Sequence, residues 1–189
     1  MKRLLSITAI VIAAAVAADA GHARDVVYPP IENAVPNSWD ANPFSLQYAD
    51  GRTLTSEQLK GKMVFIDAWA TWCAPCMPSL PKFGKLYNDN IGNPYVKVVS
   101  VHLSSRYGRF ENAADFLRSK GLYYPVLQDP EGTLIEDIDI MPLNSAVPHY
   151  VLLDETGKII RRYGEINDKV IVDVQNRFNK FAAAKRAQR

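Results

Sequence analysis

The only two cysteines of the 189-residue chain lie close together, in the segment Cys73-Ala74-Pro75-Cys76. Two thiols at this spacing can form and reopen a disulfide, or can bind a soft metal ion together as thiolates. A purely structural bridge fits poorly, because closing so short a loop removes little entropy from the unfolded chain. A chain of this length can also bury a sufficient apolar core without a covalent staple. The pair therefore indicates thiol chemistry.

Metal binding is the main alternative use of such a pair. A closed zinc site needs four ligands, and the chain has no further cysteine and only three histidines, so we expect no structural metal. Cu(I) suits soft thiolates, so a Cu(I)-binding metallochaperone that uses the same two sulfurs stays open as a function of a different class.

The residues around the pair predict a strand followed by a helix. Met63-Val64-Phe65-Ile66 is apolar without alternation, which is typical of a strand covered on both faces. From about Ala74 to Asn90, apolar side chains recur at helical spacing. Cys73 then lies at a helix N-terminus, where free N–H groups and the helix dipole favour a thiolate. We therefore predict that Cys73 is the attacking nucleophile and that Cys76, one turn later, is the resolving thiol.

Asp67 is a carboxylate at the end of this otherwise apolar strand. Burying an unpaired charge is costly, so we expect burial to raise the pKa of Asp67 and to keep part of the group protonated. The alternative is a structural aspartate that only hydrogen-bonds neighbouring backbone.

Strands and helices alternate along the rest of the chain, and a hairpin and a helix close it. The predicted strands lie at about residues 44–48, 53–54, 96–103, 123–127, 150–154 and 158–161. The predicted helices lie at about 55–61, where Thr55 and Gln58 form a capping box, at 111–120, and from Val170 onwards. This order predicts an α/β protein, a three-layer sandwich around one mixed sheet.

The first twenty residues have the pattern of an export signal. Lys2 and Arg3 precede the apolar run Leu4–Ala17, and Ala18-Asp19-Ala20 is a small-x-small cleavage pattern. An uncleaved membrane anchor is the alternative, but the run is short for a bilayer crossing. We therefore predict a signal peptide at 1–20, an extended lead-in at 21–41, one domain at 42–189 and a periplasmic location.

The charge is nearly balanced, with 22 Lys and Arg against 20 Asp and Glu and a net charge of +2. Apolar types make up 48% and charged types 22%, which is ordinary globular composition. No basic surplus calls for nucleic acid, so none is expected as a partner.

The segment from Phe65 to Cys76, Phe-Ile-Asp-Ala-Trp-Ala-Thr-Trp-Cys-Ala-Pro-Cys, resembles the active-site segment of the thioredoxin superfamily. The surrounding pattern resembles the exported TlpA/ResA-like branch of that superfamily. Pro81 stands where the family has a helix-kinking proline, and Val147-Pro148 where it has a cis-proline before a strand. The resemblance implies a thioredoxin fold with an N-terminal β-hairpin and a central helical and strand insertion at about 108–139.

The resemblance also implies roles for single residues. Asp67 would accept the proton of Cys76, and a second set would bind the client protein: Trp72, Pro75, Val147 and Pro148. Val147 would do so through backbone hydrogen bonds to an extended client segment. Two residues depart from the family pattern. His149 stands where the family often has threonine, and Ser79 stands where it often has glutamate. A cationic His149 imidazole would lower the pKa of Cys73 if it approached that thiol.

These features predict an exported protein-disulfide reductase that needs no cofactor. The resemblance implies apocytochrome c or copper-site cysteines as clients and a membrane-embedded thiol carrier as the electron donor. A disulfide-forming oxidase is an alternative, because the direction depends on the reduction potential. A non-catalytic domain that binds partners beside Pro148 is another.

Overall fold

The computed structural model describes residues 43–103, 112–130, 134 and 147–188. The predicted signal peptide (1–20), the lead-in (21–41) and part of the predicted insertion (108–139) lie outside the described residues. Within the described ranges, no helix combines the length and the apolar character that crossing a membrane requires.

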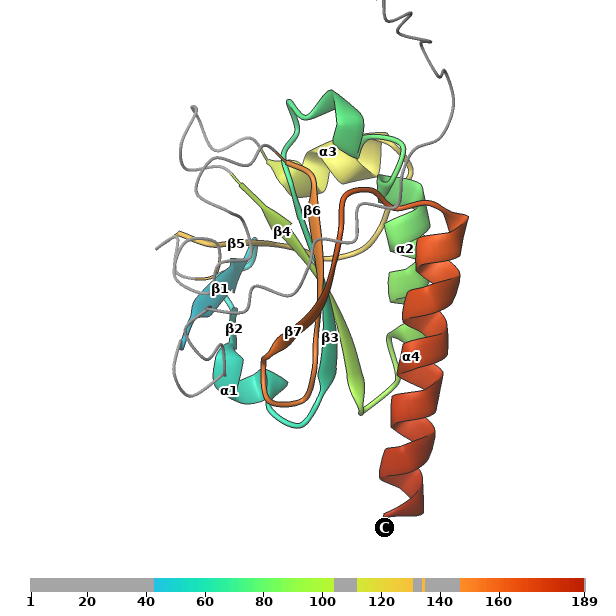
Figure 1. Cartoon of the computed structure of the whole chain (residues 1–189). Coiled ribbons are helices and arrows are strands. Elements are labelled where there is room, and N and C mark those ends of the chain that lie inside the picture. Colours follow the sequence, from blue (N-terminus) through green and yellow to red (C-terminus); the bar gives the residue numbers. More distant parts are fainter. Residues whose placement is uncertain (1–42, 104–111, 131–133, 135–146, 189) are drawn as a thin grey trace, which may run out of the picture.

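Seven strands form one mixed sheet (Figure 1): β1 (Ser45–Tyr48), β2 (Thr53–Thr55), β3 (Met63–Trp69), β4 (Val96–His102), β5 (Val126–Gln128), β6 (His149–Leu153) and β7 (Ile159–Tyr163). Their order across the sheet is β2-β1-β5-β4-β3-β6-β7. β3, β4 and β5 run parallel, whereas β1, β2, β6 and β7 pair antiparallel with their neighbours. The mixed sheet and the predicted N-terminal hairpin are confirmed.

Helices lie on both faces of the sheet: α1 (Ser56–Leu59), α2 (Leu80–Asn90), α3 (Ala113–Ser119) and α4 (Asp168–Ala187). α2 and α4 lie side by side on one face (Figure 1), where Lys82 forms an ion pair with Asp168. α3 joins β4 to β5 on that same face, and Leu59 of α1 is buried on the other. The predicted α/β sandwich is confirmed, as is the capping box at the start of α1.

The predicted helix Ala74–Asn90 is not continuous. A single 3-10 turn, η1 (Ala74–Cys76), comes first, and α2 begins after a further break. Prolines explain the break, because Pro75, Pro78 and Pro81 have no N–H to donate to a preceding carbonyl. Pro81 is the second residue of α2, where a missing N–H costs no helical hydrogen bond. The resemblance implied a proline that kinks a longer helix, but here Pro81 stands at the start of one.

β5 is also shorter than the predicted strand 123–127. Pro125 has no N–H for the strand ladder, which begins only at the next residue. Tyr124 instead packs on α2, with its ring centroid 5.3 Å from that of Phe83. Gly84 permits this approach, because a Cβ at that position would lie 2.9 Å from the tyrosine ring.

Each face of the sheet has its own apolar core, because side chains alternate along a strand. On β3, Val64 and Ile66 belong to the core on the α1 side, whereas Phe65 and Trp69 belong to the core under α2 and α4. All seven residues of β3 are buried, which confirms the strand predicted to be covered on both faces. By the same alternation, Asp67 faces α2 and α4.

Candidate active site

The two cysteines follow the carboxyl end of β3 and are joined as a disulfide. Their sulfurs are 1.98 Å apart and their Cα atoms 5.3 Å apart. The N–H of Cys76 donates to the Cys73 carbonyl at 3.0 Å, which closes η1 around the bond. Cys73 is 2% exposed and Cys76 is 0% exposed, so the disulfide lies just beneath the surface.

Cys73 does not lie at the N-terminus of a long helix, contrary to the prediction. It is the N-cap of η1, which is a single turn. Its own N–H already donates to the Ala70 carbonyl at 3.0 Å. A single turn aligns few peptide dipoles, so the helix dipole contributes little to a Cys73 thiolate in this structure.

The surface beside the disulfide is apolar. Trp72 is 56% exposed, although an indole of this size usually buries most of its area. Ala74 and Pro75, between the two cysteines, are exposed as well. The predicted client-binding residues Trp72 and Pro75 are therefore accessible to a second protein.

Val147, which precedes Pro148, lies against the disulfide although it is far from it in the chain. The Val147–Pro148 peptide bond is cis, as the resemblance implied. The Val147 carbonyl oxygen is 3.5 Å from the Cys73 sulfur. Val147 is buried and Pro148 is half-buried. The fold thus brings the predicted cis-proline segment to the cysteine pair.

Asp67 is fully buried on the face that also carries the disulfide. Among the described residues, neither of its carboxylate oxygens has a hydrogen-bond partner. Burial raises the pKa of Asp67 well above its ordinary value, as predicted, because the charged form loses its hydration. In the sheet, Asp67 lies between Ser100 of β4 and Tyr150 of β6.

Three polar pairs near the site were not predicted from the sequence. The Trp69 indole N–H donates to the Ser100 hydroxyl (2.8 Å), the Thr71 N–H donates to His102 Nε2 (3.1 Å), and the hydroxyls of Tyr150 and Ser79 are 2.5 Å apart. The only sequence signal is the period-two placement of Ser100 and His102 in a strand otherwise rich in valine. Periodicity predicts the face of a side chain but not its partner on another strand.

His149 does not share the face of the disulfide. It pairs with Ala68 in the β3–β6 register, one position away from the pair of Asp67 and Tyr150. Alternate residues of a strand point to opposite faces, so the His149 side chain lies on the face of Val151. This position gives no support to the hypothesis that His149 lowers the pKa of Cys73.

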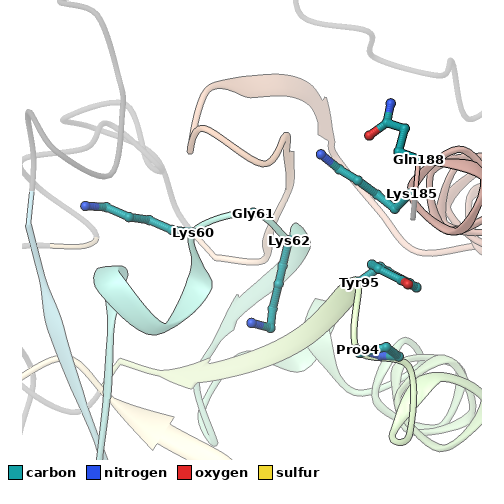
Figure 2. A pocket seen from close by; sticks show the side chains of 7 residues that line it. All are labelled: Lys60, Gly61, Lys62, Pro94, Tyr95, Lys185 and Gln188. Carbon is teal, nitrogen blue, oxygen red and sulfur yellow. The ribbon is translucent and has the colours of Figure 1, made fainter.

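A pocket of about 390 Å³ lies at the opposite end of the sheet, lined by Lys60, Gly61, Lys62, Pro94, Tyr95, Lys185 and Gln188. Figure 2 shows its three lysine amines pointing in different directions. Lys60 and Lys185 already pair with Glu57 and Glu155. Among the residues that the structure describes, no three His, Cys, Asp or Glu side chains are grouped to hold a metal ion. The disulfide remains the candidate active site.

A mixed α/β sheet, a disulfide of closely spaced cysteines after a central strand and a cis-proline against it together define a redox protein of the thioredoxin fold. A model of the Redoxin family matches residues 32–177. The chain therefore belongs to the Redoxin family.

Individual relatives indicate which activity within the family this chain has. The chain is 29% identical over 138 residues to the thiol-disulfide oxidoreductase ResA of Bacillus subtilis (strain 168), covering 72% of this chain and 73% of the relative. It is 31% identical over 135 residues to the thioredoxin-like protein YneN of the same organism, covering 70% and 74%. The crystal structure of StoA from Bacillus subtilis matches with a TM-score of 0.57 and 26% identity, covering 74% of this chain and 96% of that one. The chain is a TlpA/ResA-like thiol-disulfide oxidoreductase with disulfide-containing substrates.

Proposed function

We propose that this oxidoreductase reduces disulfides in exported client proteins through the Cys73-Ala74-Pro75-Cys76 pair. The observation that carries the proposal is the Cys73–Cys76 disulfide, held against the Val147 carbonyl next to a cis-proline. The half-exposed Trp72 supports it, since the indole offers an apolar contact surface at the edge of the pair.

The reaction begins with the reduced pair. The Cys73 thiolate attacks one sulfur of a client disulfide, that S–S bond breaks, and the other client sulfur leaves as a thiolate. Cys76 then gives its proton to Asp67, and the new thiolate attacks the Cys73 sulfur. The mixed disulfide breaks, the second client sulfur leaves as a thiolate, and the enzyme pair is oxidised. Two electrons pass from the enzyme dithiol to the client.

Asp67 suits the proton step because burial raises the pKa of its carboxyl. An acceptor works best when its pKa is close to the working pH, and an ordinary carboxyl group would be too acidic. Asp67 is fully buried on the disulfide face, and burial raises the pKa of its carboxyl.

The client segment would bind across the pair in an extended conformation. The backbone of Val147, next to Pro148, would pair with it as an added strand, while Trp72 and Pro75 contact its apolar side chains. In an oxidising compartment the enzyme needs a steady source of electrons, which we assign to a membrane-embedded thiol carrier. Clients in cytochrome c or copper-site maturation fit this scheme, because their cysteines must be reduced before they bind a cofactor.

Substitution of one cysteine at a time tests the order of the two steps. In Cys76→Ser, the reduced protein should trap a client on Cys73 as a mixed disulfide, and catalytic reduction of insulin should fall to background. Cys73→Ser should neither trap a client nor reduce insulin, and it is the matched control because it also lacks the intramolecular disulfide. A Cys76→Ser protein that turns over as fast as the wild type would refute the two-thiol mechanism.

The direction of the reaction is tested by the reduction potential of the pair, measured by equilibration with glutathione or dithiothreitol. A reductase requires a value below about −200 mV, whereas a value near −120 mV would identify a disulfide-forming oxidase.

Export is tested by sequencing the N-terminus of the protein recovered from its native compartment. A start near Gly21 supports cleavage of the predicted signal peptide, with residues 21–41 as the lead-in to the domain at 42–189. An intact N-terminus in the membrane fraction would mean an uncleaved anchor.

A further inference from the structure

Tyr150 is a buried tyrosine in the middle of the candidate site. It lies on β6 directly opposite Asp67 of β3, and its side chain is 1% exposed. Its ring stacks on that of Phe65, with centroids 6.4 Å apart and an angle of 9° between the planes. Its hydroxyl lies 2.5 Å from the hydroxyl of Ser79, which belongs to the break between η1 and α2.

The direction of the hydrogen bonds in this pair follows from a third group. The Ser79 hydroxyl donates its single proton to the Cys76 carbonyl at 2.7 Å. Tyr150 must therefore be the donor to Ser79. Burial, together with the nearby Asp67, raises the pKa of Tyr150, so its phenol stays protonated and can donate. A chain of two hydroxyls thus runs from β6 to the backbone of the second cysteine.

The Cys76 carbonyl depends on this chain because the surrounding backbone is irregular. It accepts the N–H of Ser79 at 3.2 Å and the Ser79 hydroxyl at 2.7 Å, and both donors belong to one residue. Pro75 and Pro78 supply no N–H to this stretch. The link from Ser79 to Tyr150 ties the irregular segment to the rigid centre of the sheet.

We propose that Tyr150 and Ser79 are positioning residues for the resolving thiol: their hydroxyl chain holds the Cys76 backbone where its sulfur can reach both Cys73 and Asp67. This inference rests on the proposed function, in which Cys76 acts second. Loss of the chain leaves the first attack by Cys73 unchanged and slows the second attack by Cys76.

The two steps can be timed separately with Ellman's disulfide, DTNB, added in excess to the reduced full-length protein. Attack by Cys73 releases one thionitrobenzoate and leaves the other on Cys73 as a mixed disulfide. Attack by Cys76 on the Cys73 sulfur releases the second and closes the protein disulfide. Stopped-flow absorbance then gives one rate for each cysteine.

Tyr150→Phe is the main variant, because it removes the hydroxyl and keeps the ring that stacks on Phe65. The second release should slow about fivefold, the value of one net hydrogen bond, while the first stays unchanged. Ser79→Ala should have the same effect, and the double variant should be no slower than either single one, since both break one chain.

Tyr163→Phe is the matched control. Tyr163 pairs with Tyr150 across the β6–β7 register, and its hydroxyl donates to Asp173 of α4 rather than to the active-site segment. This variant should change neither release. Equal slowing of both releases in Tyr150→Phe, or full additivity in the double variant, would overturn the proposal and leave a general packing effect. If the wild type itself shows no second, Cys76-dependent release, the proposed two-thiol function fails, and the positioning role that rests on it is overturned as well.

Discussion

The two faces of the central sheet are built from the same three strands but differ in chemistry. On the α1 side, β3, β4 and β6 contribute mainly aliphatic side chains, with the half-buried Lys97 and with His149, both near strand ends, as the exceptions: Val64, Ile66, Val99, Val101, Val151 and Leu153. On the side of α2 and α4, the intervening positions include four polar side chains: Asp67, Ser100, His102 and Tyr150. The six aliphatic and the four polar side chains are all buried.

The comparison shows how a buried face can carry polar groups at a tolerable cost. Ser100, His102 and Tyr150 each take part in a hydrogen bond, with Trp69, Thr71 and Ser79 respectively. Such pairing offsets much of the penalty of removing a polar group from water. Asp67 is the exception on this face, because among the described residues its carboxylate oxygens have no hydrogen-bond partner. In the proposed mechanism, this carboxyl accepts the proton of Cys76. One face therefore stabilises the fold, and the other gives up some stability for chemistry.

Truncation of a side chain on the apolar face should have the largest effect on stability. Leu153 is 0% exposed, and Leu153→Ala should lower the free energy of unfolding by about 2–5 kcal/mol. Urea unfolding of the oxidised protein measures this loss. Insulin reduction per folded molecule should not change. Val172→Ala, at a 57% exposed position of α4, is the control and should unfold like the wild type. A loss of specific activity in Leu153→Ala would show that the two faces are coupled.

Removal of the buried Asp67 carboxyl should instead raise the free energy of unfolding. Because the pKa of Asp67 is raised in the fold, Asp67 is protonated in a larger fraction of folded than of unfolded chains, so wild-type stability falls as the pH rises above about 4. Asp67→Asn should therefore stabilise the oxidised protein by about 1–3 kcal/mol at neutral pH, and the gain should shrink toward pH 4. The second release from DTNB should slow.

Asp173 is the control for Asp67, because the fold lowers the pKa of its carboxyl instead of raising it. Burial acts to raise its pKa, but hydrogen bonds from Arg177 and Tyr163 outweigh burial and lower it. Asp173→Asn should thus destabilise at neutral pH, with a difference that disappears in acid. A stability gain in Asp67→Asn that is constant with pH would contradict a raised pKa.

Trp72→Ala should have the smallest effect on stability, within about 0.5 kcal/mol, because the indole is more than half exposed. Its effect should appear in recognition: the KM for a protein client rises while the rate with DTNB stays the same. Ile91→Ala, at an exposed position at the end of α2, should change neither quantity. Equal losses with insulin and DTNB would place Trp72 in the chemistry rather than in client binding.

Much of this architecture could be predicted from local patterns. The unbroken apolar run of β3, the capping box of Thr55 and Gln58 and the stripe of α4 each reflect burial or capping within one element. The break between η1 and α2 was also visible in principle, as three prolines in seven residues from Pro75 to Pro81. Helical spacing alone obscured it, because apolar periodicity continues across a break in the backbone hydrogen bonds.

The contacts across elements could not be predicted in this way. Strand register decides that Tyr150, and not His149, lies opposite Asp67, and a shift of one residue would exchange them. Nothing in the local pattern of Ser79 indicates a tyrosine 71 residues further along the chain.

By itself, the sequence determined which atoms can do the chemistry: two thiols at fixed spacing, a carboxyl in an apolar strand and a proline before another strand. These depend on residue type and local periodicity, which act over a few residues. Only the tertiary structure decided which groups meet, because contacts such as Val147 with Cys73, 74 residues apart, depend on strand order and register across the whole sheet. Burial, which raises the pKa of Asp67, is likewise the combined result of all the elements packed around it.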